Sequence, residues 1–176
     1  MKVILATLLA LFSTTALAQA KGYVGVVGGF SVPDAEDTSG RPLFGAMAGS
    51  RLDGELGLGG YFLSSSKKEK INSVDADFNY SLYGIEGSFH FEGVAEGAFV
   101  ALRMGMAKIK AGDGNFSPFS YGLGFGYDHF FTPNVSIGID AGFMSVQKDN
   151  DTVNGVSVTM KAFNMLNFLV AAKFWF

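Results

Sequence analysis

Hydrophobic and polar residues alternate along most of the chain after residue 20. Such a period of two is typical of a β-strand whose two faces meet different surroundings. Glycine inside nearly every alternating segment would cost a helix about 1 kcal/mol per residue. The first half of the last segment fits the pattern least. The eight predicted strands are Gly22–Val32, Leu43–Leu52, Leu56–Ser65, Phe78–Glu92, Gly97–Lys110, Phe119–Phe130, Asn134–Val146 and Val156–Phe176.

The connections between these segments alternate between long and short. The long ones are PDAEDTSGRP, SKKEKINSVDAD, AGDGNFSP and QKDNDTVNG, and the short ones are DGE, GVAE and FTP. A transmembrane barrel has short periplasmic turns, long outer loops and an even number of strands. The pattern therefore predicts an all-β fold, an eight-stranded antiparallel up-and-down transmembrane β-barrel with both chain ends on the periplasmic side.

The two faces of each predicted strand differ in size and polarity. In Asn134–Val146, the large residues Val135, Ile137 and Ile139 alternate with Ser136, Gly138 and Asp140. An arginine facing lipid at mid-depth costs about 2–4 kcal/mol, so we expect the face that carries Arg103 to line the lumen. Small residues suit that face, because an eight-stranded barrel has room inside only for side chains.

The first 20 residues have the features of a secretory signal peptide. Lys2 precedes the apolar run Val3–Phe12, and Ala18-Gln19-Ala20 is a small-x-small cleavage site. The run is too short for a spanning helix, which needs about 20 residues. We expect residues 1–20 to be removed and 21–176 to form the barrel. With 12 cations and 16 anions left, the formal charge is −4, which argues against nucleic acid as a partner.

The chain ends in NFLVAAKFWF, an apolar stripe at steps of two. With the signal peptide and the eight strands, this ending resembles the small outer-membrane β-barrel proteins of the OmpA/OmpX type. The resemblance implies an outer membrane of a Gram-negative-type bacterium, with its lipids and lipopolysaccharide as surroundings. It also implies that the barrel-assembly machinery recognises the last strand. The residues that carry this signal are Phe168, Val170, Ala172, Phe174 and Phe176.

Charged residues on the predicted lumen face suggest an ion-pair cluster. If the GVAE turn pairs Glu92 with Gly97, Glu86 lies opposite Arg103, and Asp140 lies at the same height. Gly122 and Gly124 of the intervening strand would leave space for the guanidinium. Buried charges persist when they are paired and hydrogen-bonded. We therefore predict a mid-barrel cluster of Glu86, Arg103 and Asp140, with Arg51, Asp128 and Lys173 on the same face.

The segment SFHFE is the only catalytic-looking pattern. Ser88, His90 and Glu92 lie at steps of two on one strand face, about 7 Å apart. A nucleophile and its base need about 2.6–3.2 Å, so we expect Ser88 not to reach His90 and expect no catalytic site. A hydrogen-bonded lumen histidine is the simpler interpretation of His90, and His129 is interpreted as a rim residue.

Other motifs predict no cofactor and no metal. Gly122, Gly124 and Gly126 lie within a strand and precede no helix, unlike a dinucleotide-binding loop. DNDTVNG lacks the calcium-loop pattern. Lys67, Lys68 and Lys70 in a predicted outer loop suggest a contact with anionic lipopolysaccharide.

The sequence thus predicts a monomeric, non-enzymatic barrel with a structural or surface-interaction role through its extracellular loops. The first alternative is a narrow pore gated by the ion-pair cluster. The second is an enzyme that modifies lipid A, which the spacing of Ser88 and His90 disfavours.

Overall fold

The computed structural model describes residues 21–34, 40–52, 54–71, 74–91, 97–111, 114–153 and 155–176, with the backbone alone for 67–71, 74–78 and 111. The predicted signal peptide, Glu92 and the GVAE turn lie outside these residues. The strands are β1 (Lys21–Pro33), β2 (Arg41–Leu52), β3 (Leu56–Ile71), β4 (Val74–His90), β5 (Ala98–Ala111), β6 (Gly114–Phe116), β7 (Phe119–Thr132), β8 (Val135–Val146), β9 (Asp149–Val153), β10 (Val156–Met160) and β11 (Phe163–Trp175).

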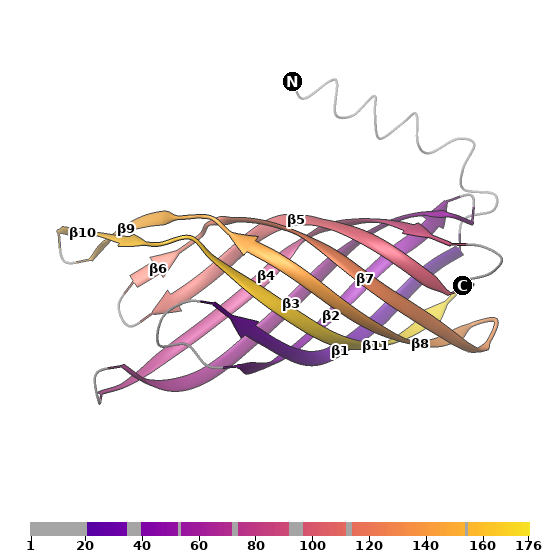
Figure 1. Cartoon of the computed structure of the whole chain (residues 1–176), viewed down its shortest axis with the longest axis horizontal. Helices are drawn as coiled ribbons and strands as arrows, with labels where there is room; N and C mark the ends of the chain where they lie inside the picture. Colours follow the sequence, from indigo (N-terminus) through magenta and orange to yellow (C-terminus); the bar gives the residue numbers. More distant parts are fainter. Residues whose placement is uncertain are drawn as a thin grey trace, which may run out of the picture.

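Eight of these strands close into a barrel, as the sequence predicts (Figure 1). Each pairs antiparallel with its neighbours in the order β1, β2, β3, β4, β5, β7, β8, β11, and β11 returns to β1. Tyr23 of β1 lies opposite Trp175, and Phe30 lies opposite Phe168, which confirms the predicted closure. No helix among the described residues is long and apolar enough to cross a membrane.

The two ends of the barrel differ. The C-terminus and the short turn between β7 and β8 lie at one end, whereas the β9–β10 hairpin extends from the other (Figure 1). The short β7–β8 turn and the β9–β10 hairpin thus lie at opposite ends, and the end with the short turn is the one that the sequence predicts to face the periplasm.

The alternating faces take the predicted directions. Leu102 and Leu123 point outward and are each 61% exposed, whereas Arg103 of the alternate face is 3% exposed. Trp175 faces the lumen and Phe176 faces outward. A soluble barrel would bury its large apolar residues, so the exposed apolar wall is that of a protein surrounded by lipid.

Two strands run further than predicted. The third connection was expected to be a loop over residues 66–77, but β3 and β4 continue through most of it as a hairpin. The register pairs Lys68 with Asp77 and Lys70 with Asp75. Beyond the membrane both strand faces meet water, so the alternation that identified the other strands is missing here.

The predicted strand Val156–Phe176 was wrong in its first half. Residues 156–160 form β10, which pairs with β9 in a separate hairpin, and the barrel strand β11 begins at Phe163. Part of the predicted loop 147–155 is therefore strand. The alternation VSVT continues across the break, which is why sequence periodicity alone joined the two strands.

The outer half of the lumen is more apolar than predicted. Inward-facing apolar side chains from seven of the eight barrel strands, all except β7, pack there against one another, and β6 adds one. They include Leu43, Leu63, Tyr80, Leu82, Ile109, Phe116, Met144, Val146 and Met165. This packed layer fills the outer half of the barrel around the buried Arg41, and the other inward-facing charges of the described residues lie in the half nearer the periplasm.

A close approach of β4 to β5 predicts a sensitive position. Gly84 and Gly105 are cross-strand partners, and a Cβ on Gly84 would overlap the carbonyl oxygen of Met104. A Cβ on Gly87 would meet nothing within 4 Å. We expect Gly84→Ala to destabilise the barrel by about 2 kcal/mol through overpacking, and Gly87→Ala to be neutral.

The measurement is urea unfolding followed by the migration of unboiled samples on a gel, where the folded barrel runs apart from the boiled chain. Equal midpoints for the Gly84→Ala and Gly87→Ala variants would contradict the predicted steric clash.

Candidate functional site

The central site of the barrel is a three-residue ion cluster. Arg103 of β5 donates from Nε to Glu86 Oε2 at 2.7 Å. Its Nη1 and Nη2 donate to the two carboxylate oxygens of Asp140 on β8, at 2.9 and 2.8 Å. The guanidinium therefore bridges β4 to β8 across the lumen. The structure brings together the three residues that the sequence places at one height.

Two glycines make this bridge possible. A Cβ on Gly124 would lie 3.0 Å from Nη1 of Arg103 and 3.1 Å from Oδ2 of Asp140. A Cβ on Gly142 would lie 3.2 Å from the same Nη1. The expectation that Gly122 would share this role was wrong, because Gly122 lies against Phe143 and Met144. Register explains the difference, since Asp140 lies opposite Gly126 and its carboxylate leans toward Gly124.

A second ion pair lies nearer the periplasm. Lys173 Nζ donates to both carboxylate oxygens of Asp128 at 2.8 Å. The ammonium also lies over the rings of Phe99 and Tyr23, at 5.1 and 5.4 Å. An aromatic face attracts a desolvated cation, so Lys173 is held on several sides.

The two ion sites border one small space. Glu86, Arg103, Asp140 and Lys173 line a void that leaves about 10 Å³ for a water-sized sphere, which is room for about one water molecule. The three carboxylates and two cations of the two sites carry a formal charge of −1. The geometry suits a filled, cross-linked lumen.

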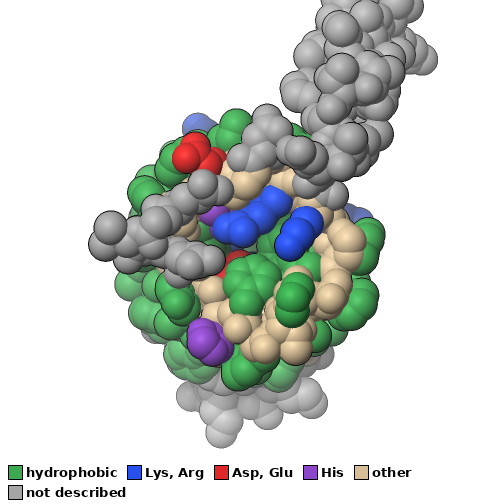
Figure 2. All heavy atoms as spheres, turned by 90° about the vertical axis from the view of Figure 1, so that its right-hand side faces the viewer, with side chains coloured by type: hydrophobic (Ala, Val, Ile, Leu, Met, Phe, Trp, Pro, Cys, Tyr) green, Lys and Arg blue, Asp and Glu red, His purple; other side chains and the backbone are tan. Residues whose placement is uncertain are grey.

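Arg51 belongs to neither ion site. Its guanidinium lies 5.8 Å from the ring centre of Trp175 near the periplasmic end. Trp175 donates from Nε1 to Ser136 Oγ at 2.9 Å and packs against Tyr23, with 4.8 Å between ring centres. Figure 2 shows Lys and Arg side chains inside the mouth at this end, ringed by hydrophobic side chains. Trp175 and Arg51 thus cover the periplasmic floor.

One inward-facing cation was missed at the sequence level. Arg41 is fully buried and lies over the ring of Tyr80 at 5.4 Å. The sequence pattern placed Arg41 in a loop. It lies an even number of positions from Leu43 and Arg51, which would have put it on the same lumen face.

Ser88 and His90 contradict the expectation drawn from strand spacing. Ser88 Oγ lies 3.1 Å from His90 Nε2, because both side chains lean together over Gly57, where a Cβ would collide with Ser88 Oγ. Within the described residues His90 Nδ1 has no hydrogen-bond partner, so the pair lacks the third group that orients a catalytic base. His129 lies exposed at the rim beside Phe131.

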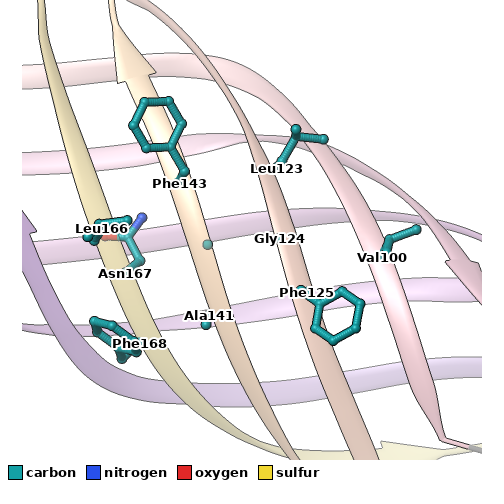
Figure 3. A pocket seen from close by; sticks show the side chains of 10 residues that line it. Val100, Leu123, Gly124, Phe125, Ala141, Phe143, Leu166, Asn167 and Phe168 are labelled. Carbon is teal, nitrogen blue, oxygen red and sulfur yellow. The ribbon is translucent and has the colours of Figure 1, made fainter. Parts of the chain in front are cut away.

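The outer wall carries an apolar groove of about 490 Å³ (Figure 3). Ala141 lies at its floor among larger outward side chains, which include Leu123, Phe125, Phe143, Leu166 and Phe168. The groove therefore offers packing and no acid–base chemistry. The described residues contain no group of His, Asp and Glu side chains that could hold a metal ion.

Sequence and structure comparisons identify the family. The family model described as outer membrane protein beta-barrel domain matches residues 4–174. The chain belongs to this family. Its members are Gram-negative outer-membrane barrels, which places this barrel in the outer membrane.

Two solved structures illustrate the likeness of the outer-membrane barrel. Neisserial surface protein A has a TM-score of 0.70 at 13% identity, with 88% of this chain and 97% of that one covered. Ail, the attachment invasion locus protein of Yersinia pestis, has a TM-score of 0.58 at 14% identity, with 89% and 99% covered. No curated protein matches the sequence. At these identities the two structures show the fold alone.

The buried triad of this outer-membrane barrel predicts an asymmetric effect of neutralisation. Arg103→Met leaves the carboxylates of Glu86 and Asp140 without their cation, and losing one partner of a buried ion pair typically costs 3–5 kcal/mol. The triple variant E86Q/R103M/D140N removes the orphaned charges, so we expect it to recover at least half of that loss.

Urea unfolding followed by the fluorescence of Trp175, the one tryptophan of the chain, measures this effect. Lys148→Met, at an exposed outer position, is the control and should shift stability by no more than about 0.5 kcal/mol. A triple variant as unstable as Arg103→Met would contradict the electrostatic explanation.

Proposed function

We propose that this outer-membrane barrel is a non-enzymatic surface protein that acts through its extracellular hairpins. Its filled lumen serves as a rigid support. Two ion sites, a tryptophan floor and a packed apolar layer occupy the inside. Such a lumen favours a scaffold over a passage for solutes.

The β9–β10 hairpin is the observation that carries this proposal. It extends beyond the barrel wall (Figure 1), and Val156 is 64% exposed and Val158 is 39% exposed. Asp151 Oδ2 accepts the backbone N–H of Asn115 at 2.7 Å, and Asp149 Oδ2 accepts that of Ser117 at 2.6 Å. These bonds tie the hairpin to the segment around β6, so it presents its valines from a fixed base.

The similar structures are compatible with this role. One is named a surface protein and the other an attachment invasion locus protein. Attachment is the surface activity that we propose to test for this chain.

We expect V156S/V158S to reduce by more than half the attachment of bacteria that display the protein to a cultured cell monolayer. The reason is that a partner surface covering these valines would gain apolar contact area, which serine removes. The control S157A/T159S changes the opposite face of the same strand. Attachment that is equal for the wild type, V156S/V158S and cells lacking the protein would refute the proposed role.

A narrow gated pore is the second candidate, and the position of Arg103 favours it. The guanidinium spans the lumen at mid-depth, where a latch would lie. The Ser88–His90 pair gives less support to a lipid A-modifying enzyme than Arg103 gives to a pore. The pair faces the lumen near the periplasmic end, away from lipid A.

Single-channel recording in a planar bilayer separates the two candidates. We expect Arg103→Ser, with its folding checked by gel migration, to leave the conductance at the wild-type level, because the Asp128–Lys173 pair and Trp175 still fill the lumen. Resolved openings in Arg103→Ser that the wild type lacks would favour the gate.

The role of the last strand in assembly is also a proposal. Phe168, Phe174 and Phe176 point outward and are more than half exposed, and Ala172 and Val170 share their face. We propose that the assembly machinery recognises this outward stripe before β11 pairs with β1.

A further inference from the structure

The outward-facing residues of β4 and β5 change from apolar to polar at the same level. On β5, Met104 and Met106 are followed toward the outside by Lys108 and Lys110. The register pairs Tyr83 with Met106, Ser81 with Lys108, and Asn79 with Lys110. Both strands therefore leave the apolar band at one height.

Aromatic side chains mark this height as the membrane surface. Phe119 of β7 lies opposite Met106, and Phe119 and Tyr121 are each 46% exposed. Aromatic girdles lie at the interfaces of outer-membrane barrels. Lys108 and Lys110 lie one and two outward positions above the girdle, at the level of the lipid headgroups.

These lysines line a groove of about 440 Å³ on the outer side of β4, β5 and β6. The other polar residues at its wall are Asn79, Ser81, Asn115 and Ser117. Both lysines are exposed, and none of the ion pairs among the described residues involves either ammonium. The carboxylates of Asp149 and Asp151 are already bound to backbone N–H groups of the β6 segment.

We infer that this groove binds the phosphate groups of a phosphorylated glycolipid, the lipopolysaccharide of the outer leaflet. Two exposed ammonium groups at headgroup level attract phosphate, and neighbouring amide and hydroxyl groups supply further hydrogen bonds. The apolar wall directly below receives the acyl chains. The site goes beyond the proposed hairpin function and does not depend on it.

The inference changes where lipopolysaccharide contact is expected. The sequence pointed to Lys67, Lys68 and Lys70, which lie in the outer part of β3 and whose side chains are outside the described residues. Lys108 and Lys110 were overlooked because they end a strand whose lower part is apolar.

The test compares K108Q/K110Q with K148Q/K161Q, a control that removes two other exposed outer lysines. The probe is bisphosphorylated lipid A in detergent micelles, beside lipid A from which both phosphates have been removed. At about 1 kcal/mol for each lysine, K108Q/K110Q should bind bisphosphorylated lipid A about 30-fold more weakly. The control should stay within about twofold, and wild type should bind the phosphate-free lipid as weakly as K108Q/K110Q binds the phosphorylated one.

Three results would overturn the inference: unchanged affinity in K108Q/K110Q, an equal loss in K148Q/K161Q, or inorganic phosphate that binds as tightly as lipid A. The last would assign the groove to free phosphate. Gel migration of unboiled samples verifies folding, and K108R/K110R should retain binding. If K108Q/K110Q does not fold, each single variant should lose about fivefold, and no loss in either would equally refute the site.

Discussion

Closure of the sheet by β1 and β11 is the constraint on which the rest of the structure depends. Inside a bilayer every backbone N–H and C=O must find a partner within the protein, and a closed barrel achieves this without an edge. The last rung is complete, since Gly22 and Phe176 exchange both backbone hydrogen bonds at 2.9 Å. With eight strands, the circumference leaves room inside only for side chains. The charges of the two ion sites are therefore largely removed from water.

This confinement explains how the lumen is organised. Arg103 forms hydrogen bonds with two carboxylates at once. Lys173 pairs with a third carboxylate, and its ammonium also lies over aromatic rings. Any of these charges would raise the free energy of the folded state if it were buried without a partner. Because they are paired, they link strands that are distant in the sequence. The glycines at 124 and 142 belong to the same arrangement, because the bridge needs space that a side chain would fill.

The sequence predicts the barrel well because the membrane imposes a strict alternation on each spanning strand. Arg103 alone sets the phase of the faces, and strand parity then places Glu86, Asp140 and Trp175 inside. Prediction fails where that constraint ends. Above the membrane β3, β4, β9 and β10 pair in water, where both faces tolerate polar residues. The Ser88–His90 contact was missed for another reason, since Cα spacing along a strand does not describe how two side chains lean together over a glycine.

The apolar layer in the outer half of the lumen has a consequence for the electrical behaviour of the barrel. Water that passed the tryptophan floor from the periplasm would meet counter-charges at mid-depth. Beyond them lie Leu43, Leu82, Met144 and Met165, each at most 1% exposed. These side chains form an apolar constriction beside the buried Arg41, and an apolar constriction resists the entry of water. The ion sites are thus enclosed between the tryptophan floor and the apolar layer, so an ion from either side would have to lose its hydration water to reach them.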